Sequence, residues 1–107
     1  MSFLTLPVDS ESESYVFQVD LDGSIHALRF DYNTRMDRWV MGLQDLQGNV
    51  VLGGVPVQID WDLLLQYLGR AEFPPGRFVA VDESGQGRDP TRDIFGVEVK
   101  LFYEEAA

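Results

Sequence analysis

The residues that could do chemistry in this chain are few. His26 is the single histidine, the chain contains no cysteine, and no serine lies in a recognisable nucleophile motif. A nucleophile activated by a neighbouring base therefore has almost no material here. Two carboxylate pairs, Asp60 with Asp62 and Asp82 with Glu83, could in principle perform acid and base catalysis. Asp60 is better explained as a helix cap and Asp62 as a first-turn acid, so the sequence predicts no catalytic residues.

A calcium site is the second chemical possibility. Asp82, Ser84 and Gln86 precede Gly87, and Asp93 falls at the twelfth position of that stretch. A calcium-binding EF-hand loop requires a bidentate glutamate at the twelfth position and helices on both sides, whereas this stretch carries arginines and a proline between predicted strands. The absence of cysteine also excludes zinc and iron sites built on thiolates. The sequence predicts no metal and no cofactor.

The same region, residues 82–96, is a charged loop between two apolar runs. Exposed ion pairs contribute only about 0 to 1 kcal/mol each to stability, so fold stability alone does not explain a dense cluster of both signs. Arginine beside an aromatic side chain is typical of binding surfaces. We therefore expect contacts with other proteins through this loop, and also through the Trp61 segment. The predicted interface residues are Trp61, Arg88, Asp89, Pro90, Arg92, Asp93 and Phe95.

The elements that position these residues are mostly strands. Alternating apolar residues on both sides of Asp22-Gly23 predict a β-hairpin with a two-residue turn. In that register the two apolar faces coincide, which supports the choice of turn. The predicted pairs are Leu21 with Ser24, Val19 with His26, Phe17 with Leu28, and Tyr15 with Phe30.

Further strands and one helix complete the prediction. The other expected strands cover residues 3–6, 39–44, 50–52, 77–81 and 97–103. A short helix is expected over residues 60–68, capped by Asp60 and closed by Gly69. Its apolar face includes Trp61, so a core position is the competing interpretation for that residue. The sequence predicts an all-β, mainly antiparallel fold: a small barrel or sandwich of six to seven strands with one short helix.

Length and charge limit the partners. The chain of 107 residues has the size of one domain, which we expect to span residues 1–107 with a flexible acidic connector at residues 9–14. Its 18 acidic and 8 basic residues give a net charge of −10, which repels nucleic acid and anionic membranes. No secretory signal and no run of roughly 20 apolar residues is visible. We expect no direct contact with nucleic acid or membrane.

Three further segments matter for their order and spacing: residues 39–45 with Gly48, residues 75–82, and residues 88–96 before an apolar strand that ends in Phe102-Tyr103. Together they resemble the phage baseplate plug family, and the resemblance covers nearly the whole chain. Departures from the family pattern are the acidic insert at residues 10–14 and Ile94, where an acid is expected.

This resemblance implies a β-rich structural protein of the virion, made in the host cytoplasm and placed in the tail baseplate. It implies several symmetric copies that pack against the hub, the tail tube and the end of the tape measure, without catalysis. A small-molecule or carbohydrate-binding β module stays open as the alternative. That alternative requires Trp39 and Trp61 to line one open groove, whereas an assembly protein would bury one and present the other.

Overall fold

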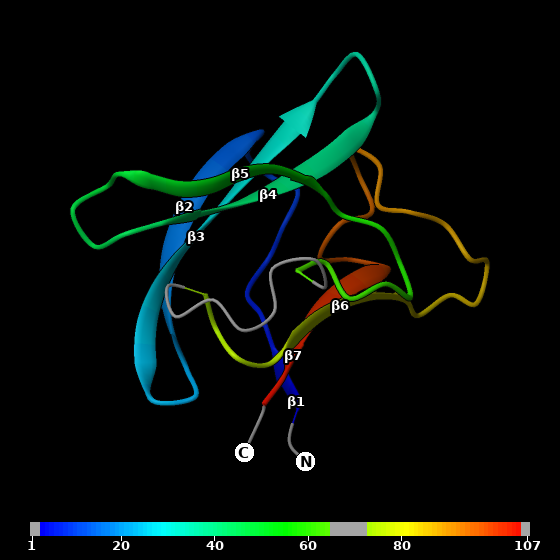
Figure 1. Cartoon of the computed structure of the whole chain (residues 1–107). Helices are drawn as coiled ribbons and strands as arrows, with labels where there is room; N and C mark the ends of the chain where they lie inside the picture. Colours follow the sequence, from blue (N-terminus) through cyan, green and yellow to red (C-terminus); the bar gives the residue numbers. More distant parts are fainter. Residues whose placement is uncertain (1–2, 65–72, 106–107) are drawn as a thin grey trace.

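The computed structural model describes residues 3–64 and 73–105, and these residues form two antiparallel β-sheets that face each other (Figure 1). The strands are β1 (Phe3–Thr5), β2 (Ser14–Leu21), β3 (Ser24–Asn33), β4 (Arg38–Gln44), β5 (Val50–Pro56), β6 (Arg77–Asp82) and β7 (Val99–Glu104). The predicted all-β, antiparallel fold is confirmed. It is sandwich-like, with sheets of four and three strands, and is not a closed barrel.

The larger sheet has the strand order β2-β3-β4-β5 and follows the chain without a crossover. All four cross-strand residue pairs predicted for the first hairpin are confirmed, from Leu21 with Ser24 to Tyr15 with Phe30. The turn works because Asp22 and Gly23 both adopt positive φ, 54° and 88°, as a two-residue turn of this type requires. Alternation in the sequence therefore sets the inward face of this sheet.

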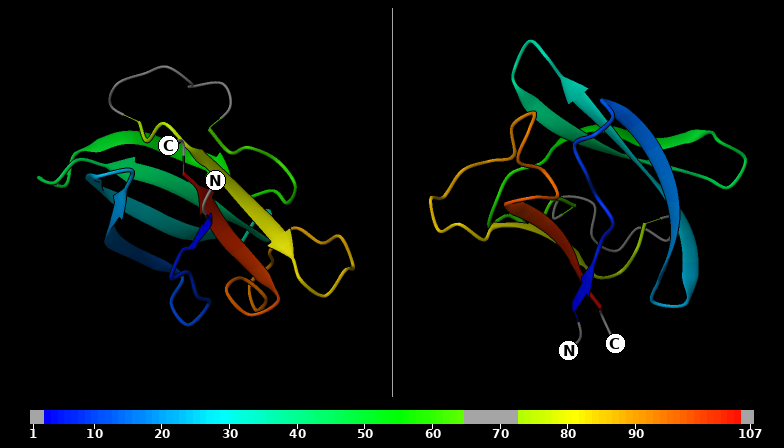
Figure 2. Two further views of the ribbon diagram at one scale, coloured as in Figure 1. Left: turned by 90° about the horizontal axis from the view of Figure 1, so that it is seen from below. Right: turned by 180° about the vertical axis from the view of Figure 1, so that it is seen from behind.

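The smaller sheet has the order β1-β7-β6, so the first and last strands of the chain pair with each other. Phe3 lies opposite Glu104, and the two ends of the chain meet at the same side of the molecule (Figure 1). Seen from below and from behind, β7 lies between β1 and β6, and the larger sheet covers their inner side (Figure 2). This pairing joins the N-terminal and C-terminal ends of the chain in one sheet.

The core between the sheets is rich in aromatic side chains. Phe95 packs against Trp39 and Phe30, with ring centroids 5.3 Å and 5.6 Å apart. The largest fully buried side chains are Trp39, Tyr103, Phe30, Phe78 and Phe95. Phe95 comes from the charged loop and not from a strand. One segment of that loop is therefore part of the core.

The predicted helix at residues 60–68 is wrong for its described part, residues 60–64, because the backbone there bonds to β6 instead of to itself. Ile59 forms a bridge with Ala80, Asp60 N–H donates to Ala80 C=O at 2.9 Å, and Leu63 N–H donates to Phe78 C=O at 3.0 Å. Asp60 has a φ of 58°, whereas a helix-capping residue has an extended backbone. The remainder, residues 65–68, and the closing Gly69 lie outside the described residues.

Close packing against the N-terminal segment fixes the end of the charged loop. Gly96 has a φ of +82°, and an added Cβ would lie 2.2 Å from the Val8 carbonyl oxygen, so only glycine fits there.

Across residues 3–64 and 73–105 there is no helix long and apolar enough to cross a membrane.

Candidate functional site

The first half of the charged loop is built around one buried carboxylate. Asp82 ends β6, and its side chain is only 1% exposed. It accepts hydrogen bonds from the Arg88 guanidinium at 3.0 Å, the Arg88 backbone N–H at 2.9 Å and the Ser84 hydroxyl at 2.6 Å. The Arg88 guanidinium, followed by these other donors, holds the pKa of Asp82 well below its usual range. Arg88 also pairs with Glu98 at 2.5 Å, so this arginine joins Asp82, at the start of the loop, to Glu98, just after its end.

The middle of the loop connects the two sheets. Asp89 accepts the backbone N–H of Ile59 at 2.9 Å and pairs with Arg38, on β4, at 2.9 Å. The indole N–H of Trp39 donates to the Thr91 carbonyl oxygen at 3.0 Å. Pro90, between these contacts, is fully buried. The Asp89 carboxylate and the Thr91 carbonyl oxygen are therefore bonded within the fold, where they join the loop to the strands.

The end of the loop holds the acidic connector. Arg92 donates to the Ser10 carbonyl oxygen, lies 3.6 Å from the Glu13 carboxylate, and places its guanidinium 5.9 Å from the centre of the Tyr32 ring. The Ser10 hydroxyl donates to the Phe95 carbonyl oxygen at 3.0 Å. These bonds attach residues 9–14 to the body of the protein without any partner.

The predicted interface residues thus separate into two groups. Pro90 and Phe95 are buried, while Arg88, Asp89 and Arg92 are half-buried in bonds within the chain. Only Trp61 and Asp93 are exposed. The expectation that fold stability does not explain the charges is wrong for Arg88 and Asp89, since both satisfy groups of the fold. A role in binding stays a prediction for all seven residues.

The residues first considered for catalysis are dispersed. His26 lies half-buried on β3 opposite Val19, and burial lowers its pKa below the ordinary value. Asp60 and Asp62 belong to the turn after β5, and Asp82 is bound by Arg88. Among the described residues, no group of three or more histidine, aspartate or glutamate side chains could hold a metal ion.

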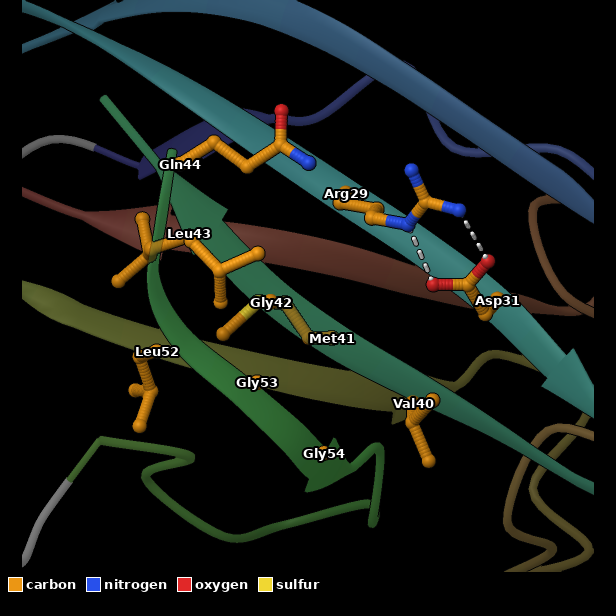
Figure 3. A pocket seen from close by; sticks show the side chains of 11 residues that line it. Arg29, Asp31, Val40, Met41, Gly42, Leu43, Gln44, Leu52, Gly53 and Gly54 are labelled. Carbon is orange, nitrogen blue, oxygen red and sulfur yellow. Dashed lines mark hydrogen bonds and ion pairs between the residues drawn. The ribbon is translucent and has the colours of Figure 1, made fainter. Parts of the chain in front are cut away.

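A hollow lies on the outer face of the larger sheet, over β4 and β5 (Figure 3). Its volume is about 210 Å³, and Gly42, Gly53 and Gly54 leave it open because they carry no side chains. At its side, Arg29 pairs with Asp31 at 2.8 Å, so the two charges neutralise each other. The hollow offers apolar surface and backbone but no reactive group.

A second groove, which the sequence did not predict, lies on the outer face of the smaller sheet. It has a volume of about 420 Å³. Its apolar lining residues are Phe3, Trp61, Val79, Val81 and Phe102. The signal in the sequence was the run of valines and phenylalanines on both faces of residues 77–81 and 97–103, which leaves apolar side chains beside Arg77 and Lys100 on the outer face.

The two tryptophans occupy opposite environments. Trp39 is 0% exposed in the core, whereas Trp61 is 54% exposed at the groove of the smaller sheet. They do not line a common surface. The open groove lined by both tryptophans, which the binding-module alternative requires, is therefore not formed, and a subunit contact at Trp61 stays a prediction.

Comparison with known proteins yields one finding. The family described as "Cyanophage baseplate Pam3 plug gp18" matches residues 3–106 of this chain. No curated protein matches the chain significantly. The matched span contains both sheets, the acidic connector and the charged loop.

Proposed function

This chain belongs to the family of cyanophage baseplate plug proteins, and we propose that it is a single-domain plug that packs against the hub and the tail tube of a phage baseplate. The family is structural, its place is the tail baseplate of the virion, and its members associate with other tail proteins. The finer assignment includes several symmetric copies, contact with the end of the tape measure, and synthesis in the host cytoplasm.

The observation that carries this proposal is the family match over residues 3–106. The geometry supports it, since the long charged loop and the acidic connector are tied to the sheets by Arg88, Asp89 and Arg92. A surface that is already ordered loses less conformational entropy when a partner binds. A small rigid sandwich with ordered loops therefore suits a part that fits between other subunits.

The alternative, a small-molecule or carbohydrate-binding module, has less support. It needs both tryptophans in one groove, but Trp39 is fully buried and its indole N–H is bonded to Thr91. A lone exposed Trp61 does not form the paired aromatic platform that this alternative predicts.

Chemical cross-linking in purified tails tests the proposal. Because Lys100 is the only lysine but 18 residues are acidic, a carbodiimide that joins carboxylates to amines of neighbouring proteins is the suitable reagent. We expect links from this chain to hub and tail-tube proteins, identified by mass spectrometry. Absence of the chain from purified tails, or tight binding of a metabolite by a chain that never enters a particle, would contradict the proposal.

A further inference from the structure

The outer face of the smaller sheet is unusually apolar for a surface. Phe102, at the centre of this face, lies opposite Val79 on β6 and Thr5 on β1. Phe3 is 63% exposed beside it, although one face of an antiparallel sheet in water is ordinarily polar. Together with Trp61 these side chains form the groove of about 420 Å³. Exposed aromatic surface of this kind marks binding sites.

The backbone of the turn after β5 presents Trp61 to this groove. Asp60 and Leu63 donate their N–H groups to β6, and Leu63 and Leu64 are buried. Asp60 itself adopts a φ of 58°, a left-handed conformation that costs an L-residue about 1 to 2 kcal/mol. The turn thus buries its leucines while it leaves the largest apolar side chain in water.

Charges around Trp61 are unbalanced. Neither Asp60 nor Asp62 forms an ion pair with any of the described residues. Within the same residues, the Asp62 carboxylate accepts one hydrogen bond, from the Leu64 N–H at 3.3 Å. The bases on the same face are already used, because Arg77 pairs with Glu104 and Lys100 lies 3.8 Å from Glu83. Within residues 3–64 and 73–105, the two carboxylates beside Trp61 therefore have no basic partner.

This pattern identifies the chemistry of the occupant. An arginine or lysine side chain can lie against the face of a tryptophan and at the same time approach nearby carboxylates. A second copy of this chain is a poor occupant, because each copy has a net charge of −10 and would bring further negative charge to the site. The groove fits a positively charged partner with an apolar side chain next to the cation.

Building on the proposed function, we propose that this groove receives a segment of another tail protein in which an arginine or lysine lies beside an apolar residue. The cation lies on Trp61 between Asp60 and Asp62, and the apolar residue covers Phe102 and Val79. This site is separate from the charged loop, whose arginines are bonded within the chain.

Site-specific photo-cross-linking in assembled tails tests this inference. Benzoylphenylalanine in place of Phe3 is a close aromatic substitute at the rim of the groove, and the same residue in place of Ile25, which is also exposed at the tip of the first hairpin, is the control. We expect position 3, and not position 25, to link to a segment of another tail protein that contains an arginine or lysine.

Three outcomes would overturn the inference while the proposed function stands: a link from position 3 to a second copy of this chain, a link to a segment without a basic residue, or no link although the chain is present in tails. Absence of the chain from tails would instead contradict the proposed function itself. The two failures are therefore distinguishable.

Two variants test the named contacts in competition with the wild-type chain for incorporation into tails. Trp61→Ala should reduce incorporation at least about tenfold, as loss of an interface tryptophan does, with only a small fall in Tm because about half of the residue is already exposed. Asp60→Asn should reduce it about fivefold, since asparagine tolerates the left-handed backbone and removes only the charge. Glu11→Gln, which neutralises an exposed acid elsewhere, should have no effect. Incorporation of Trp61→Ala at the wild-type level would overturn the inference.

Discussion

The arginine and aspartate side chains of the charged loop differ in their bonding partners within the fold. A side chain that bonds to a buried group is more costly to transfer to another protein than an exposed one. The Asp82 carboxylate is almost completely enclosed and receives donors from Arg88 and Ser84. Removal of either partner would leave a buried polar group unsatisfied, which is more costly than the loss of an exposed ion pair. Asp93, on the same loop, is exposed, and its carboxylate forms no hydrogen bond or ion pair within residues 3–64 and 73–105.

The Asp82 carboxylate should make stability depend on acid. Arg88 lowers the pKa of Asp82 in the folded protein. The ionised Asp82 therefore contributes fully to the free energy of unfolding above the ordinary aspartate pKa of about 4, and this contribution is lost as the pH falls below that value. Asp82→Asn should therefore lower Tm at pH 7, and its difference from wild type should shrink toward pH 2. Thermal melts of both proteins from pH 7 to pH 2 measure this. Asp93→Asn serves as control, and an Asp82→Asn deficit that stays constant with pH would contradict the assignment.

Tyr103 joins the two sheets through a single hydroxyl. It donates to the Asp22 carboxylate at 2.5 Å and accepts the Gly76 N–H at 2.8 Å, and burial raises its pKa far above the ordinary value. Tyr103→Phe should cost about 1 to 3 kcal/mol, because the Gly76 N–H is left buried without its acceptor. Urea denaturation gives the free energy of unfolding. Tyr32→Phe, at an exposed hydroxyl bonded to Asp37, should cost less than about 0.5 kcal/mol, and equal losses would show that the buried bond has no special role.

Among the elements, sequence patterns correctly predicted those that are held by contacts between residues close together in the chain. The register of the first hairpin follows from Asp22-Gly23 and the alternation around it, because both partner strands are adjacent in sequence. The helix at residues 60–68 was mispredicted in its described part because its competitor, β6, lies farther along the chain and supplies acceptors for Asp60 and Leu63. Tertiary hydrogen bonds overrode the local helical spacing.

The candidate site was predicted less well than the strands, for a related reason. Phe95 stands among charged residues in the sequence, yet its ring packs on Trp39 and Phe30 in the core. The groove on the smaller sheet joins Phe3 at one end of the chain to Trp61 in the middle and Phe102 near the other end. No window of neighbouring residues contains that surface, so only the fold could bring it together.

The inward face of the larger sheet gives a test of graded burial. Phe30, on the inner strand β3, is fully buried, whereas Phe17, on the edge strand β2, only partly packs against the core. Phe30→Ala should cost about 3 to 5 kcal/mol, the usual range for a core phenylalanine. Phe17→Ala should cost clearly less, because part of its ring is already in water. Chemical denaturation of both variants decides this, and a larger loss at Phe17 would mean that the edge of the sheet is covered.

Attachment of the acidic connector depends on one side chain from a distant loop. Arg92→Ala removes the bond to the Ser10 carbonyl oxygen and the ion pair with Glu13. We expect a glutamate-specific protease to cleave after Glu11 or Glu13 about tenfold faster in this variant, since a charge-assisted hydrogen bond contributes about 1.5 to 3 kcal/mol to local stability. Arg35→Ala, at an exposed arginine in the turn after β3, is the matched control. Equal cleavage of all three proteins would show that other contacts hold the connector.

The net charge of −10 acts on the molecule as a whole. The protein measures 33 × 30 × 22 Å, which is close to the screening length of about 30 Å at 0.01 M salt, so nearly all its charges repel one another in dilute buffer. This repulsion opposes folding and also keeps copies apart, whereas a basic partner relieves it. Binding of a cationic segment at Trp61 is therefore consistent with the charge of the entire chain.

Screening should stabilise the isolated protein. Addition of NaCl from 0.01 M to 0.5 M weakens repulsion among the excess acids, and relief of about 1 kcal/mol would raise Tm by about 4 to 8 °C for a domain of this size. Glu11→Lys, which lowers the net negative charge by two at an exposed position, should raise Tm in 0.01 M salt and lose that advantage in 0.5 M salt, because both changes act on the same repulsion. Differential scanning calorimetry at the two salt concentrations measures both effects. A fall of Tm with salt would show that the ion pairs of Arg88, Asp89 and Arg92 outweigh the repulsion, and that the charge of this protein serves its fold more than its partners.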